Sequence, residues 1–389
     1  VAKNGFINLH LSKDYLRNNI SKALDFPGVG KGKTVMVEYT DPNPFKLFHI
    51  GHLMSNTIGE AISRLYEATG TKVIRVNYQG DVGLHVAMAI WAIRNKLVNI
   101  EFLRSNEAPL NEKVKSMNQA YAIGAQAYKL GLESYNEETI NDKKQIDEIN
   151  EKIYNRSDDK INNLYDLGKK LSLEYFETIY KRLGTRFDRY FFESEVASDG
   201  LKIIKEHPEV FVESDGAKVF RGEEHGLHTR VFVSSKGLPT YEAKELGLNK
   251  KKFEKDKLNL SIIITGNEIN DYFKVLLKVM ELTMPEVAQK TKHIGHGMMR
   301  LSAGKISSRT GEVVTAESLI DEVKAMLPGS DEDIKESIAV GAIKYFILKQ
   351  SPEHDIVFNF EKSVSIKGDA APYLQYTYAR LTGIKKKAL

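Results

Sequence analysis

Two short stretches near the start of the chain combine β-branched side chains with alternating polarity. Residues 34–39 carry this pattern and residues 72–78 repeat it, so both are predicted to be strands. Between them, apolar side chains recur with the i, i+3, i+4, i+7 spacing of an amphipathic helix. They are Ile58, Ala61, Ile62 and Leu65. Gly70 follows at the position of a helix C-cap.

A strand, a helix and a second strand in so short a stretch predict a βαβ unit and a parallel sheet. Polar, helix-forming sequence then fills residues 105–185, of which 133–163 is strongly charged. Strand patterns return at 230–233 and 260–265, and the chain reads as helical from 317 onward. We therefore predict an α/β fold whose parallel sheet is split by a helical insertion and followed by a mainly helical C-terminal region.

Composition narrows the possible chemistry. The chain has 389 residues, 42% hydrophobic and 28% charged, as expected of a globular protein with a sizeable core. It has no cysteine, which excludes disulfides, thiolate nucleophiles and cysteine-bound zinc. No apolar run has the roughly 18 residues of a membrane span, and no signal peptide begins the chain, so we expect a cytoplasmic protein without membrane partners. The net charge of +4 permits a nucleic-acid partner without indicating one.

The loop after the first predicted strand carries the first candidate for chemistry, Phe48-His-Ile-Gly-His52. Ligands of parallel sheets bind beyond the carboxyl ends of the strands, and a helix N-terminus there favours phosphate. His49 and His52, three apart, would point the same way, while Gly51 lets a nucleotide approach the backbone. A single histidine at a helix start is more often structural. A metal site would lack a third ligand at matched spacing.

A second candidate lies some 250 residues later, in Gly304-Lys-Ile-Ser-Ser-Arg-Thr-Gly311. Its glycines and basic side chains are typical of a loop that closes over polyphosphate. Lys305 would neutralise the pyrophosphate leaving group, and Arg309 would assist. Taken alone, this octapeptide is equally compatible with a basic surface loop.

Together, the two segments resemble the HIGH and KMSKS signatures of class I aminoacyl-tRNA synthetases. The second lysine of KMSKS is replaced by Ser308. Arginyl enzymes often lack that lysine and carry another just upstream of HIGH, where this chain has Lys46. Residues 76–83 (VNYQGDVG) and 372–380 (PYLQYTYAR) also resemble arginyl-family stretches. The resemblance thus covers nearly the whole chain and implies catalytic roles for His49, His52, Lys46 and Lys305.

The resemblance implies a Rossmann-type catalytic domain divided by a connective insertion. We expect five regions: 1–30, the end of an N-terminal tRNA-binding domain and a linker; 31–104, the first half of the catalytic domain; 105–185, the insertion; 186–316, the second half with the KMSKS-like loop; and 317–389, a helical stem-contact region and the start of an anticodon-binding domain. On this interpretation the chain is a truncated core that binds ATP and arginine but charges tRNA poorly.

Recognition of arginine requires carboxylates and a flat or hydroxyl-bearing neighbour, because a guanidinium is planar with five donors. Tyr241 and Glu245 match the family's Tyr-x-x-x-Asp motif, with glutamate for aspartate, and share one helix face. The resemblance adds Glu193, Asn43 and, near a family glutamine, Glu268 to the arginine site. It also implies an ATP site formed by His49, Gly51, His52, Gly80, Asp81, His296, Gly297, Met298, Lys305, Ser307 and Arg309.

The expected function is that of an arginine–tRNA ligase whose substrates are L-arginine, ATP and tRNA(Arg). The arginine carboxylate would attack the ATP α-phosphate, with Mg²⁺ sharing the phosphate charge, and the arginyl group would pass to the tRNA ribose. We expect a monomer without a protein-held metal. The alternatives are a class I synthetase for another amino acid, a nucleotidylyltransferase with an H-x-G-H helix start, and a non-catalytic tRNA-binding paralogue.

Overall fold

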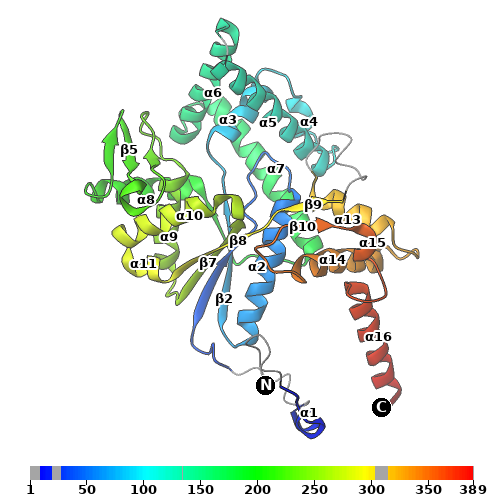
Figure 1. The fold of residues 1–389 in the computed structure, drawn as a ribbon. Helices are drawn as coiled ribbons and strands as arrows, with labels where there is room; N and C mark the ends of the chain where they lie inside the picture. Colours follow the sequence, from blue (N-terminus) through cyan, green and yellow to red (C-terminus); the bar gives the residue numbers. More distant parts are fainter. Residues whose placement is uncertain (1–8, 20–27, 134, 303–313, 389) are drawn as a thin grey trace.

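A five-stranded sheet with the strand order β3-β2-β1-β7-β8 lies at the centre of the computed structural model (Figure 1). The structure describes residues 9–19, 28–133, 135–302 and 314–388. Every neighbouring pair of strands in this sheet is parallel. The strands are β1 (Thr34–Glu38), β2 (Lys72–Gln79), β3 (Arg189–Phe192), β7 (Leu260–Gly266) and β8 (Thr291–His296). The predicted α/β fold with a parallel sheet is therefore confirmed.

Strand β1 is buried on both faces, which explains its nearly continuous apolar sequence. Val35 and Val37 face a core that includes α2 (Ile50–Ala68). Met36, pointing the other way, packs in a second core with Val196 and Leu248. These two residues come from α8 (Glu193–Glu206) and α9 (Tyr241–Lys255). Helices on both sides thus hold the central strand and the loop that follows it.

Helix α2 begins within the first signature, at Ile50, and ends where the sequence indicated. His49 is its N-cap and Thr69 its C-cap. Gly70 has a φ of +84°, a left-handed conformation that suits glycine after a helix end. The predicted strand, helix and strand are confirmed, and the carboxyl end of β1 leads directly into the N-terminus of α2.

The sequence between β2 and β3 forms helices that extend from one end of the sheet (Figure 1). They are α3 (Leu84–Arg94), α4 (Ile100–Arg104), α5 (Leu110–Glu133), α6 (Glu137–Asn155) and α7 (Asp159–Leu183). The second half of α7 returns to the main core, where Tyr175, Phe176, Ile179 and Tyr180 are buried. The expected helical insertion is present, and its exact boundaries stay a prediction.

One strand prediction was wrong in its placement. Residues 230–233 do form a strand, β6, but it pairs antiparallel with β5 (Ala217–Phe220) rather than joining the parallel sheet. β5 in turn pairs with β4 (Val212–Ser214), giving a separate three-stranded sheet. The reason is visible in its burial: the first half of β6 is partly exposed, as antiparallel strands tolerate and central parallel strands do not.

The remaining elements complete the second half of the chain. They are α1 (Lys13–Asn19), η1 (Gly222–His225), η2 (Asn267–Ile269), α10 (Asn270–Thr283), α11 (Pro285–Gln289), β9 (Met299–Leu301), α13 (Ala316–Ala325), α14 (Glu332–Leu348), β10 (Ile356–Phe358), α15 (Phe360–Ser363) and α16 (Ala371–Ala388). The predicted helical character after 317 holds except for β10, which pairs with β9. No helix in the described ranges is long and apolar enough to cross a membrane.

Candidate active site

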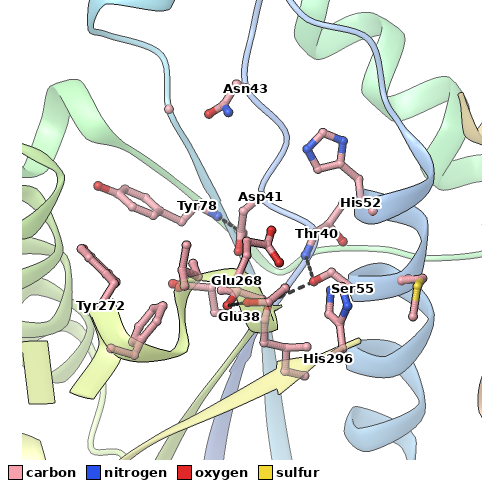
Figure 2. Close-up of a pocket in the computed structure, with 18 of the residues that line it drawn as sticks. Glu38, Thr40, Asp41, Asn43, His52, Ser55, Tyr78, Glu268, Tyr272 and His296 are labelled. Carbon is pink, nitrogen blue, oxygen red and sulfur yellow. Dashed lines mark hydrogen bonds between the residues drawn. The ribbon is translucent and has the colours of Figure 1, made fainter. Parts of the chain in front are cut away.

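A cavity of about 760 Å³ opens at the carboxyl ends of the central strands, where the sequence placed the chemistry (Figure 2). Its walls come from the loop after β1, the start of α2, the end of β2 and the first turns of α8 and α9. Twelve predicted site residues line it: Asn43, His49, Gly51, His52, Gly80, Glu193, Tyr241, Glu245, Glu268, His296, Gly297 and Met298. Side chains far apart in sequence are thus brought to one place.

The two histidines of the first signature form a reciprocal cap on α2. His49 Nδ1 accepts a hydrogen bond from the Gly51 N–H (3.1 Å), and His52 Nδ1 accepts one from the His49 N–H (3.2 Å). The rings are stacked, with centroids 3.6 Å apart. Because Nδ1 acts as the acceptor in both rings, a neutral ring carries its proton on Nε2. Each histidine therefore has one N–H left to donate to a ligand.

Both histidines are neutral near pH 7. Burial, followed by the nearby Lys46 ammonium, lowers the pKa of His49 below its usual value. Burial, followed by the proximity of His49 and of the Lys46 ammonium, lowers the pKa of His52 well below its usual value. Donors fixed in advance at a helix N-terminus are suited to hold phosphate oxygens as charge develops on them.

The chain just after the second signature runs beside the first. The Ile50 N–H donates to the Val314 carbonyl (3.1 Å), and the Ala316 N–H donates to the Phe48 carbonyl (2.9 Å). These bonds flank a bridge between His49 and Thr315. Lys305, Ser307 and Arg309 themselves lie outside the described residues. The backbone at Val314 and Ala316 is nonetheless held against the start of α2, although more than 250 residues separate the two in sequence.

The loop between β1 and α2 adopts an uncommon backbone. Thr40, Asp41 and Phe45 have φ values of 86°, 47° and 67°, in the left-handed region that non-glycine residues rarely occupy. Several hydrogen bonds hold it: the Thr40 N–H donates to Ser55 Oγ (2.9 Å), and the Tyr78 N–H donates to Asp41 Oδ1 (2.7 Å), as Figure 2 shows. Such strain is retained where the surroundings over-determine the conformation, commonly at functional sites.

Three predicted arginine-site residues converge on Gly80. A Cβ atom added there would lie 2.3 Å from Asn43 Oδ1 and 3.3 Å from both Glu193 Oε1 and Tyr241 Oη. The first of these distances is an overlap, so any larger residue at this position would displace the Asn43 side chain. Gly80 therefore leaves room for a ligand, or for a neighbouring polar group, among these side chains.

The same end of the cavity gathers buried carboxylates. Glu193 and Glu245 are 0% and 5% exposed. Burial and then the charge of Glu38 raise the pKa of Glu245 to about 8. Burial likewise raises the pKa of Glu193, although Lys244 opposes the shift. Burial and Glu38 raise that of Asp41. A bound cation stabilises the ionised form of such buried carboxyl groups. This end of the cavity is therefore suited to a positively charged ligand.

Comparison with known proteins identifies the family. Residues 17–360 match the model described as tRNA synthetases class I (R), catalytic domain. The chain belongs to this arginyl family of class I aminoacyl-tRNA synthetases. It is 29% identical over its full length to an arginine–tRNA ligase of Fusobacterium nucleatum and 31% identical over 98% of its length to one of Treponema denticola. It spans 68% and 67% of those two proteins.

Solved arginyl-tRNA synthetases share the fold. The Thermus thermophilus structure superposes with a TM-score of 0.73 at 20% identity, covering 96% of this chain and 68% of that one. The Plasmodium falciparum structure gives 0.72 at 21% identity, covering 97% and 65%. The fold class and the family predicted from the sequence are both confirmed.

Among the described residues of this synthetase domain, two predicted site residues do not line the cavity. The Lys46 Nζ lies 4.2 Å from the centroid of the Tyr121 ring, and Tyr121 belongs to helix α5. Asp81 is fully buried and accepts hydrogen bonds from Tyr165 Oη (2.7 Å), Lys169 Nζ (2.7 Å) and Ser194. Its contacts tie the loop after β2 to α7 and α8, and its predicted role in ATP binding stays a prediction.

Several residues of the synthetase cavity had not been selected from the sequence. Glu38, Asp41, Arg230, Glu242 and Tyr272 all line it. Glu38 ends the first strand and Asp41 follows it, so the rule that ligands bind at strand carboxyl ends would have found both. Arg230 and Glu242 form an ion pair at 3.5 Å. They come from separate elements, so no regular spacing in the sequence indicates that they meet.

No group of three or more histidine, aspartate or glutamate side chains could hold a metal ion in the ranges that the structure describes. The described donor set therefore does not form a protein cage for Mg²⁺.

Proposed function

We propose that this chain activates L-arginine with ATP and passes the arginyl group to tRNA(Arg). The observation that carries the proposal is the two-ended cavity: capped histidines at a helix N-terminus at one end and buried carboxylates at the other. In the first step an oxygen of the arginine carboxylate bonds to the α-phosphorus while the bond to pyrophosphate breaks. In the second, the terminal ribose hydroxyl of the tRNA attacks the arginyl carbonyl and releases AMP.

At the acidic end, Glu193 and Glu245 would hold the guanidinium and the α-ammonium of arginine. Tyr241, which shares the α9 face with Glu245, would contribute its ring and hydroxyl. Asn43 would hold the amino-acid end of the substrate, and Glu268 would stand between the two ends of the cavity. The carboxylates are close to one another and buried, so a cationic substrate relieves their repulsion and a neutral one does not.

At the other end, the Nε2–H groups of His49 and His52 would donate to phosphate oxygens, and the backbone at Gly51, Gly297 and Met298 would hold the nucleotide. His296, 3% exposed, is fixed by its contact with the Gly297 carbonyl (2.8 Å). The pyrophosphate would be held by the predicted loop residues Lys305, Ser307 and Arg309. Mg²⁺ arriving with ATP supplies further charge neutralisation for the phosphates.

Lys46 would assist from behind the histidines, where it acts through charge. Its ammonium is close enough to depress the pKa values of His49, His52 and His85. This keeps the histidine donors neutral and adds positive potential near the α-phosphate. Four expectations stay predictions. They are the division of the chain into five regions, a monomeric state, a cytoplasmic location and the role of Asp81 in ATP binding.

A binding experiment tests the amino-acid half of this proposal. Isothermal titration calorimetry should show L-arginine binding in the presence of a non-hydrolysable ATP analogue. L-citrulline, which replaces the guanidinium with a neutral urea of similar shape, should bind at least about a hundredfold more weakly, because it leaves buried carboxylates unpaired. Equal binding of the two ligands would contradict recognition through charge.

A further inference from the structure

A buried lysine sits directly behind the proposed arginine site. Lys244, on α9, forms an ion pair with Glu193, the first residue of α8, and the two side chains are 4% and 0% exposed. Its Nζ also lies 3.5 Å from Tyr154 Oη on α6 and 4.9 Å from the centroid of the Tyr241 ring. One ammonium thus contacts groups from the catalytic core and from the helical insertion.

The two oxygens of Glu193 have different surroundings. Oε2 accepts the hydrogen bond from Lys244. Oε1 is buried and has no hydrogen bond of full geometry among the described residues, while the Tyr241 hydroxyl lies close enough to favour the ionised carboxylate. It faces the space above Gly80, 3.3 Å from where a Cβ would stand. The carboxylate is therefore anchored through one oxygen and presents the other to the cavity.

We propose that Lys244 is a positioning residue for arginine binding, which keeps Glu193 ionised and oriented so that Oε1 can accept a hydrogen bond from the substrate. The inference rests on the proposed function and deepens it. Lys244 is not itself among the residues that line the arginine cavity; it lines a neighbouring one, and Tyr241 stands in the wall shared by both. The ammonium consequently holds Glu193 from the far side without occupying the place of the substrate.

Charge balance supports this role. A carboxylate with 0% exposure and no cation would take up a proton, because desolvation disfavours its charged form. A protonated Glu193 would offer a cationic substrate only a neutral oxygen. The Lys244 ammonium keeps Glu193 ionised. Its second contact is Tyr154, so the affinity for arginine depends on the position of α6 in the insertion.

The test measures the arginine dissociation constant of Lys244→Met as a function of pH. Loss of a charge-assisted contact predicts arginine binding weaker by roughly 10–100-fold at pH 7.5, with ATP binding unchanged. The deficit should widen as the pH falls to 6.5, because Glu193 without its cation protonates more readily. Lys244→Arg, which keeps the charge, should restore most of the affinity. If the methionine variant does not fold, Lys244→Gln replaces it.

The matched control is Lys251→Met. Lys251 lies on the same helix and also contacts α8, through the Glu195 carbonyl (3.0 Å), but outside the cavity. Its arginine affinity should equal that of the unaltered chain. An unchanged affinity in Lys244→Met would overturn the proposal, and tighter binding would show instead that Lys244 competes with the substrate for Glu193. Failure of the proposed function is distinguishable, because Glu193→Gln itself would then leave arginine binding unaffected.

Discussion

Arginine binding should strengthen with rising pH because Glu245 must lose a proton. This carboxyl is 5% exposed, and burial together with the charge of Glu38 raises its pKa to about 8. A cationic ligand pairs with the ionised form. If binding requires that form, the competent fraction rises from about 3% at pH 6.5 to about 50% at pH 8, so the arginine dissociation constant falls roughly fifteenfold.

Calorimetry at the two pH values measures this change directly. At pH 7.5, repeating the titration in buffers of different ionisation enthalpy should also reveal net proton release on binding. Replacing Glu245 with glutamine should flatten the pH profile and weaken binding at pH 8. Glu254→Gln, an exposed carboxylate on the same helix, is the matched control and should keep the profile of the unaltered chain.

The stability of the unliganded protein should fall as the pH rises, in contrast to its affinity for arginine. The pKa of Glu245 in the folded state lies above its usual 4.5, so the associated stability is present at low pH and is lost as the pH rises from about 4.5 to about 8. Thermal unfolding without arginine should therefore show a decline across this window that Glu245→Gln reduces. An arginine affinity independent of pH, with no proton release, would refute the assignment of an ionised Glu245 to the substrate.

Three further substitutions test other parts of the structure. His49→Ala should lower the rate of ATP–pyrophosphate exchange by roughly 10²–10³, the usual loss for one preorganised transition-state donor, and an unchanged rate would make the histidine cap purely structural. Gly80→Ala places a methyl group 2.3 Å from Asn43 Oδ1 and should abolish measurable arginine binding while circular dichroism stays unchanged; normal binding would show that the loop can move aside. Lys252→Met leaves Glu38, at 2.7 Å and 1% exposed, without its buried cation, and denaturant unfolding should report a loss of about 3–5 kcal/mol. A loss below about 1 kcal/mol would show that the buried Glu38–Lys252 pair contributes little to stability.

Local patterns were sufficient to predict the elements closest to the chemistry. Strand β1, helix α2 and strand β2 follow from alternating and helical periodicity, and the HIGH-like segment was placed at the helix start because ligands of parallel sheets bind there. The strand with which a given strand pairs could not be predicted in the same way. Residues 230–233 look like any short strand, and only tertiary packing decides that they join an antiparallel sheet.

The ion pairs that buried charges form could not be predicted from the sequence either. Glu193 was selected by resemblance, yet its cation Lys244 lies 51 residues away on another helix. The ion pair between Glu38 and Lys252 spans strand β1 and helix α9. Such pairs have no fixed spacing, because they depend on which elements the fold brings together. Asp81 lies in a family-like stretch, but it accepts hydrogen bonds from α7 and α8 and does not line the cavity, which its place in the sequence did not indicate.

The central claim is tested most directly by ATP–pyrophosphate exchange with each of the 20 standard amino acids, in the presence of tRNA(Arg). L-Arginine alone should stimulate exchange, and the signal should disappear in a Glu193→Gln variant that still binds ATP. Exchange driven by another amino acid, such as glutamate or cysteine, with none for arginine would contradict the account.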